Sequence, residues 1–144
     1  MKNYLLLATV MTGCMIPLLS ILAVWLKNGA RDVEPAPARS WRLDLYDPAT
    51  GRLLRRHFYA ALVLGRDTGG PEPEGVLFLT DDGTVSRRQC RLTAVGNEVW
   101  AENLSQVNET VLNGIPLGTP RPLRQGDSLL VGRRLFRVQR LTPL

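Results

Sequence analysis

Residues 103–114 read NLSQVNETVLNG, and this stretch carries the clearest local signals for the fold. A polar segment leads into the short run Thr110–Leu112, and Asn113-Gly114 follows directly. Asn-Gly is the dipeptide that a two-residue β-hairpin turn favours, because both central residues of that turn need positive φ. The stretch therefore predicts a loop, a short strand and a tight hairpin.

Similar strand and turn signals continue on both sides of this stretch. Residues 41–46 alternate large apolar with polar side chains, residues 47–51 form a turn, and residues 52–64 are extended again, which predicts a hairpin. Further strands are predicted at residues 75–79, 89–95, 98–102, 128–131 and 135–141, with turns at Asp82-Gly83, Gly96-Asn97 and Gln125-Gly126-Asp127. Many short strands with regular turns are typical of an all-β sandwich.

Almost no helix is expected after Lys27, because no stretch there keeps a helical apolar period over three turns and prolines interrupt most of it. In a sandwich, alternate apolar side chains of the strands fill the space between the two sheets. The expected core residues are Leu43, Leu45, Phe58, Leu62, Leu64, Leu77, Leu79, Leu92, Trp100, Leu112, Leu129, Val131, Phe136 and Val138.

The N-terminal residues 4–26 contain no charged side chain. As a helix they would extend roughly 35 Å, which is enough to cross the hydrocarbon core of a bilayer. We therefore predict a single transmembrane helix or signal anchor. A cleaved signal peptide is the alternative, but the run exceeds a usual h-region and no small-x-small cleavage site follows it. Thr12-Gly13-Cys14 resembles the end of a lipobox, yet the apolar run continues beyond it, so Cys14 is interpreted as a packing residue.

Basic residues near the ends of this segment predict its orientation. Lys27, Arg31, Arg39 and Arg42 follow the segment, whereas only Lys2 precedes it. The positive-inside rule then places the C-terminal domain in the cytoplasm. Residues 28–40 are rich in proline and alanine and predict a short, semi-rigid spacer. The predicted organisation is a single-pass membrane anchor at 1–27, a linker at 28–40 and a β-sandwich domain at 41–144.

Charge and reactive side chains narrow the classes of function. From Lys27 onward the chain has 17 basic and 13 acidic residues, a surplus that suits nucleic acid, anionic lipid or phosphorylated protein. The arginines are dispersed among acids, which disfavours a nucleic-acid surface. Cys14 and Cys90 are expected to be free thiols, and neither metal nor cofactor is expected because His57 is the only histidine and no CxxC occurs. Isolated His57 and Cys90 also argue against an enzyme.

Four further motifs join residues 103–114 in a fixed order along the chain. They are Leu64-Gly65-Arg66, Val85-Ser86-Arg87-Arg88-Gln89-Cys90, Leu123-Arg124-Gln125-Gly126-Asp127 and Leu130-Val131-Gly132. As a set, these motifs resemble those of a forkhead-associated (FHA) domain, and the resemblance covers about residues 41–141. It implies an eleven-stranded β-sandwich whose apical loops bind phosphothreonine peptides.

The resemblance also implies roles for individual residues. Arg66 and Ser86 are expected to bind the phosphate, Arg87 to assist, and Asn108 to hold the peptide backbone. The turn and scaffold positions are Gly65, Gln89, Thr110, Asn113 and Gly114. The chemistry agrees, because a doubly charged phosphate needs a guanidinium and hydroxyl or backbone donors on rigid loops.

Taken singly, each of these residues has an ordinary structural explanation. Arg66 with Asp67 could be a surface charge pair, Ser86 a strand cap, and Asn108 a turn former. Arg87, Arg88 and Arg91 could be a solvated strand edge that resists edge pairing. It is the order of the whole set that favours binding.

Three positions depart from the FHA pattern. Gln89 stands where a histidine usually braces the loops, and its amide can still form hydrogen bonds. Val107 replaces a usual threonine and keeps only the backbone N–H. Glu109 replaces a usual glycine and brings a carboxylate near the expected phosphate. It would weaken binding if it turned inward, and binding would persist if it turned to solvent or paired with Arg87 or Arg88.

Two functions follow from these expectations. The first is a membrane-anchored adaptor whose cytoplasmic domain binds a phosphothreonine-containing protein, such as the substrate of a Ser/Thr kinase. The alternative is a phosphate-independent scaffold subunit of a membrane assembly of the secretion or pilus type. Neither nucleic acid nor a small-molecule substrate is expected as a partner.

Overall fold

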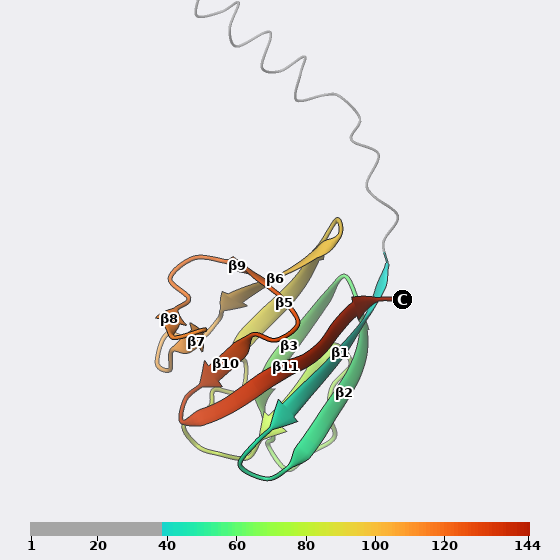
Figure 1. The fold of residues 1–144 in the computed structure, drawn as a ribbon. Coiled ribbons are helices and arrows are strands. Elements are labelled where there is room, and N and C mark those ends of the chain that lie inside the picture. The colour runs from blue at the N-terminus through green and yellow to red at the C-terminus, as the bar shows by residue number, and fades with distance from the viewer. Residues whose placement is uncertain (1–38) are drawn as a thin grey trace, which may run out of the picture. The chain divides into compact units, whose positions relative to one another are not determined.

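The computed structural model describes residues 39–144, so the predicted membrane segment and most of the predicted linker lie outside the described residues. Eleven strands form two facing sheets (Figure 1). The strands are β1 (Ser40–Asp47), β2 (Arg52–Tyr59), β3 (Ala61–Arg66), β4 (Val76–Thr80), β5 (Cys90–Val95), β6 (Glu98–Asn103), β7 (Thr110–Leu112), β8 (Ile115–Pro116), β9 (Arg121–Leu123), β10 (Ser128–Val131) and β11 (Arg134–Pro143). The predicted all-β sandwich is confirmed for this part of the chain.

The order of strands is β2-β1-β11-β10-β7-β8 in one sheet and β4-β3-β5-β6-β9 in the other. Among the described strands, only β3 and β4 pair in parallel. Residues 39–144 contain no helix, and hence none that could cross a membrane.

The core lies between the sheets and follows the alternation of each strand. In β1, Trp41, Leu43 and Leu45 face the core, and Phe136 and Val138 of β11 lie opposite with no exposed surface. The expected core residues are confirmed with one exception. Trp100 faces outward, because its neighbours Val99 and Ala101 take the inward positions of β6. Residues 37–144 form one compact unit with its own core, so the domain can be studied as a separate fragment.

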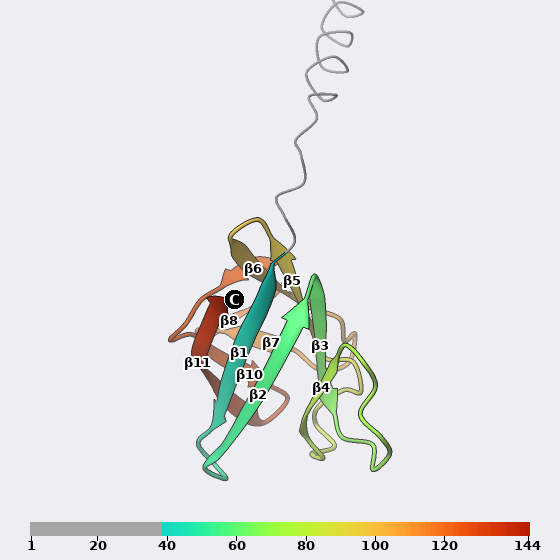
Figure 2. The same cartoon turned by 90° about the vertical axis from the view of Figure 1, so that its right-hand side faces the viewer.

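One predicted strand is two strands in the structure. Residues 52–64 were expected to be continuous, but the chain breaks at Ala60, which has a φ of 62°. This left-handed residue lets β2 end in the six-stranded sheet and β3 begin in the five-stranded sheet (Figure 2). A non-glycine residue at positive φ is uncommon, so no sequence signal marked the crossing.

Two short strands, β8 and β9, were not predicted. Each contains a proline, Pro116 in β8 and Pro122 in β9, and proline is normally a signal against a strand. Both strands lie at the edge of their sheets, where a missing backbone donor costs no ladder hydrogen bond. The Asn113-Gly114 turn between β7 and β8 is confirmed, with φ of 50° and 81°.

The two ends of the sandwich differ. β1 begins and β11 ends at one end, where the Leu144 N–H donates to the Ser40 carbonyl over 2.8 Å (Figure 1). Strand β3 runs away from this end, and its terminal residue Arg66 lies at the opposite, apical end. The loops at residues 81–89, 104–109 and 132–133 also lie at the apical end, because β5, β7 and β11 begin there.

Gly132 is expected to be essential to the apical end. A Cβ on Gly132 would lie 2.2 Å from the Thr84 carbonyl oxygen, and the residue has a φ of 57°. Gly132→Ala should therefore lower the free energy of unfolding by about 2–4 kcal/mol, from the left-handed backbone and the clash together. Urea denaturation of the 39–144 fragment measures the loss.

Gly51→Ala is the matched control, because Gly51 has a φ of 70° but open space around it. It should lose only about 1 kcal/mol. Equal losses in both variants would show that the contact with Thr84 does not constrain Gly132.

Candidate functional site

Three apical segments meet at the end of β3. The Arg66 N–H donates to the Ser86 carbonyl over 3.0 Å, and the Gln89 N–H donates to the Leu64 carbonyl over 2.9 Å. These two backbone hydrogen bonds hold the 81–89 loop against the last residues of β3. Ser86 is therefore fixed beside Arg66 by the main chain.

Gly65 permits this close approach. It lies inside β3 rather than in a turn, and a Cβ there would lie 1.9 Å from the Arg87 carbonyl oxygen. Any side chain would push the 81–89 loop away from β3. The glycine is thus needed for space, whereas the sequence had assigned it to a tight turn.

The buried amide of Gln89 joins the 81–89 loop to the 104–109 loop. Its side chain has no exposed surface. Its Oε1 accepts from the Ser86 N–H over 2.9 Å, and its Nε2 donates to the Asn108 carbonyl over 3.0 Å and to Thr110 Oγ1 over 2.9 Å. One side chain therefore fixes the backbone at Ser86 and at Asn108. The expected scaffold roles of Gln89 and Thr110 agree with this geometry.

A hydroxyl and amide cluster lies above Gln89 at the surface of the loops. Ser86 Oγ lies 2.6 Å from Ser105 Oγ and accepts from Asn108 Nδ2 over 2.9 Å. Ser105 Oγ also accepts from the Asn108 N–H over 2.9 Å. The structure thus brings together Ser86 and Asn108 from two loops that are far apart in sequence.

Ser105 and Asn103 were not assigned a role from sequence. Asn103 Nδ2 donates to the Ser105 carbonyl over 2.8 Å, and its Oδ1 accepts from Thr110 Oγ1 over 2.9 Å. Asparagine and serine side chains that bond to nearby backbone groups are common in loops, so the signal was present but unspecific.

Arginines and acids both occur at this end. The half-buried Arg66 directs one guanidinium nitrogen toward the Gly83 carbonyl over 3.4 Å, while Arg87 and Arg88 are exposed. Among residues 39–144, no ion pair involves these three arginines. The guanidinium groups are therefore free to attract an anion.

Three acidic side chains, Asp81, Asp82 and Glu109, lie in the apical loops, and Asp67 directly follows Arg66. Asp82 accepts from the backbone and hydroxyl of Thr84, and these hydrogen bonds lower the pKa of its carboxyl. Glu109 is exposed, and within the described part of the chain it forms no ion pair with Arg87 or Arg88. Its side chain turns to solvent.

Not every predicted site residue lies in this cluster. Asn113 and Gly114 lie at the far end of β7, where Asn113 bonds to Asp127 and to the Ser128 N–H. Cys90 lies beneath the loops as a free, fully buried thiol, and burial raises its pKa to about 12. No group of three potential metal ligands occurs in residues 39–144.

A shallow hollow of about 340 Å³ adjoins the cluster. Its lining includes Asn108, Glu109, Gly132 and Arg133. Val107 lies at its rim with 89% of its surface exposed. The apical end therefore offers a hydrogen-bonding cluster with a hollow next to it.

Comparison with known proteins agrees with this architecture. Residues 62–132 match the family model described as FHA domain. Among curated protein sequences, none matches this chain.

Solved structures with the same fold come from different kinds of organism. The FHA domain of FhaA, solved with the intracellular domain of Rv3910, is 23% identical, with a TM-score of 0.52 over 69% of this chain and 98% of that one. The FHA domain of CT664 from Chlamydia trachomatis is 19% identical, with a TM-score of 0.55 over 72% and 96%.

The N-terminal FHA domain of Rad53p from S. cerevisiae, solved with a phosphothreonine peptide, is 18% identical, with a TM-score of 0.52 over 72% and 92%. At these low sequence identities, the similarity to the solved structures shows only that the fold is shared. The FHA family model matches residues 62–132, and the solved FHA domains share the fold of the β-sandwich.

Proposed function

We propose that the apical loops bind a phosphothreonine-containing peptide. Arg66 supplies the charge that pairs with the phosphate, and the Ser86 hydroxyl and the Val107 N–H supply further donors. Asn108 bonds to the backbone of the peptide, since its amide can both donate and accept. Arg87, exposed on the same loop, adds to the positive potential.

The observation that supports this proposal most is the buried Gln89. A recognition site works best when its groups are fixed before the ligand arrives, because binding then loses less conformational entropy. Gln89 fixes the backbone of Ser86 and Asn108 from below, while their side chains remain within 2.9 Å of each other at the surface. The cluster is thus held in place beside Arg66, which forms no ion pair within the described residues 39–144.

Structural neighbours make the proposal specific. The FHA domain of Rad53p was solved with a phosphothreonine peptide, and that of FhaA with a protein domain. This chain shares their fold, and its Arg66, Ser86 and Asn108 meet at one end. A phosphorylated protein is therefore the ligand class that we assign.

The domain acts as an adaptor at the cytoplasmic face of a membrane. The uncharged residues 4–26 anchor the chain, and Lys27 and Arg31 keep the following domain in the cytoplasm. Phosphorylation of the partner by a Ser/Thr kinase then recruits it to the membrane.

A second function is favoured by one specific observation. The Ser86 hydroxyl already bonds to Ser105 Oγ and accepts from Asn108 Nδ2, and the Asn108 N–H donates to Ser105 Oγ. The exposed Glu109 follows Asn108 directly. A domain whose loop groups are satisfied internally could serve as a phosphate-independent scaffold in a membrane assembly. The two functions differ in whether Arg66 is required.

Arg66→Ala and Ser86→Ala should each weaken binding to a phosphothreonine peptide. Loss of a hydrogen bond to a charged group costs about 2 kcal/mol, so we expect at least a tenfold higher Kd. Isothermal titration of the 39–144 fragment with a library-selected phosphothreonine peptide measures this, with the unphosphorylated peptide as a second ligand. Arg124→Ala, on a side chain that is 74% exposed, is the control and should bind normally. Equal binding of both peptides would favour the scaffold.

Glu109→Gln should strengthen binding to the same peptide. It removes a negative charge near the phosphate while keeping the size of the side chain, and we expect about a two- to fivefold lower Kd at low salt. The gain should shrink as salt screens the repulsion. An unchanged Kd at low salt would place the carboxylate too far from the phosphate to matter.

Gln89→Leu should damage both stability and recognition. Leucine leaves the Ser86 N–H and the Asn108 carbonyl without their buried partner, which should cost about 2–4 kcal/mol of unfolding free energy. Gln89→His, which keeps one donor and one acceptor, should retain most of the peptide affinity. A Gln89→Leu variant with normal affinity for the peptide would contradict the role given to this amide.

A further inference from the structure

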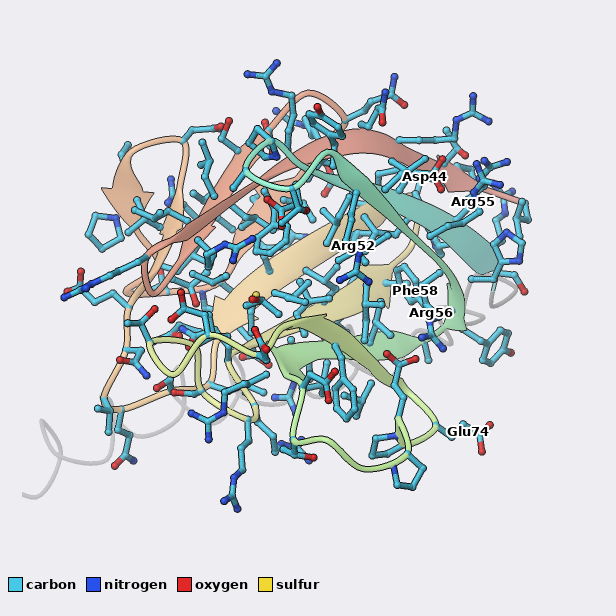
Figure 3. All side chains as sticks on the ribbon, turned by 90° about the horizontal axis from the view of Figure 1, so that it is seen from below. Asp44, Arg52, Arg55, Arg56, Phe58 and Glu74 are labelled. Carbon is cyan, nitrogen blue, oxygen red and sulfur yellow. The ribbon has the colours of Figure 1, made fainter. Side chains whose placement is uncertain are left out.

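The outer face of the six-stranded sheet is strongly basic. Strands β1, β2 and β11 alternate residues that face the core with residues that point to solvent, and the outward set includes Arg42, Arg55, Arg137 and Arg140. We call these four arginines the basic face. The outward residues of β1, β2 and β11 include one acid, Asp44. Figure 3 shows Asp44 and Arg55 on the side of the sheet away from Phe58.

Strand register places these arginines next to one another. Asp44 of β1 lies between Arg55 of β2 and Arg140 of β11, and Tyr46 of β1 lies opposite Arg137. Asp44 accepts from Arg42 over 3.0 Å and from Arg55 over 3.2 Å, and it is itself 4% exposed. Burial raises the pKa of Asp44, but the hydrogen bonds from the two arginines outweigh this and hold the pKa below its ordinary value. One carboxylate thus fixes two guanidinium groups without neutralising the face.

The opposite sheet does not share this character. On its outer face, Arg91 pairs with Glu102, and Glu98 adds a second acid. The arginines are therefore not evenly distributed over the surface. The six-stranded sheet has four outward arginines and one outward acid, whereas the five-stranded sheet has one outward arginine and two outward acids. The basic face also includes apolar groups, with Tyr46, Leu53 and Leu135 each 36–45% exposed.

Chain connectivity limits how far the β-sandwich can lie from the predicted membrane segment. β1 begins at Ser40, and Arg42 follows two residues later. The 13 residues 28–40 can span at most about 45 Å even when fully extended. A tethered domain experiences a high local concentration of whatever surface lies at the other end of the tether.

We propose that the basic face binds the anionic leaflet of a membrane. Arginines bond to lipid phosphates, and Tyr46 with Leu53 enters the headgroup region, where amphipathic aromatic rings are favoured. The apical loops lie at the end of the sandwich and not on this face, so a domain lying flat keeps its recognition site accessible. The proposal deepens the anchored adaptor proposed above by fixing how the domain is presented.

The test uses the 39–144 fragment with vesicles, so it needs neither the N-terminal segment nor a phosphopeptide. The fragment should sediment with vesicles of phosphatidylcholine containing about 30% phosphatidylserine and not with pure phosphatidylcholine. Binding should fall steeply as salt rises from about 0.05 to 0.3 M.

The informative variant is Arg137→Gln with Arg140→Gln, since both side chains are exposed and no ion pair in residues 39–144 involves them. Each arginine near an anionic surface contributes about fivefold, so we expect a loss of about 25-fold. The control is Arg52→Gln with Arg124→Gln, which removes the same charge elsewhere and should lose less than about threefold.

Three outcomes would overturn the proposal. If the fragment sediments with neither vesicle type, or equally with both, it does not recognise anionic lipid. If the two double variants lose vesicle binding equally, binding depends on net charge and not on the basic face. If vesicles do not bind but Arg137→Gln with Arg140→Gln releases a protein partner from the full chain, the face binds protein instead. Titration of the same preparations with the phosphothreonine peptide keeps the two proposals separate, because peptide binding should survive the loss of vesicle binding.

Discussion

The arrangement of the apical loops depends on the side-chain amide of Gln89. Loops seldom hold polar groups in one geometry, because their backbones lack the ladder of hydrogen bonds that fixes a strand. Here a fully buried amide provides both a donor and an acceptor, and it connects the backbones at Ser86 and Asn108. A neutral amide needs no counter-charge in the core. It can therefore occupy a position where an ionised group would be costly.

Around this amide, the positions of the strand ends determine where the polar groups of the apical surface lie. Core packing fixes the ends of β3, β5 and β6, and the two backbone hydrogen bonds at Arg66 and Gln89 lock the 81–89 loop onto them. Gly65 and Gly132 provide the space for these approaches. The polar side chains then meet on a rigid base, and Arg66, Arg87 and Arg88 beside them form no ion pair within residues 39–144.

Much of this arrangement could be predicted from sequence, because sandwich strands leave a clear alternation and Asn113-Gly114 marks its turn. The predictions of secondary structure and core that were wrong failed for physical reasons. Ala60 adopts positive φ without the usual glycine, so the crossing between sheets gave no signal. Trp100 was expected inside as one of the alternate apolar side chains of the strands, although the register of β6 puts Val99 and Ala101 there. The prolines of β8 and β9 concealed strands that lie at sheet edges.

For the site, the order of motifs predicted which residues would meet, and Arg66, Ser86 and Asn108 do share the apical end. Sequence could not show that Ser105 joins them, nor that Gly65 acts through close approach rather than a turn. It also could not decide the direction of Glu109, since that depends on loop geometry.

The most direct test is an amide-resolved NMR titration of the 39–144 fragment with a phosphothreonine peptide. The account predicts that the signals of Arg66, Ser86, Val107 and Asn108 shift with the phosphorylated peptide and stay in place with its unphosphorylated form. Shifts confined to other surfaces, or the same shifts with both peptides, would contradict it.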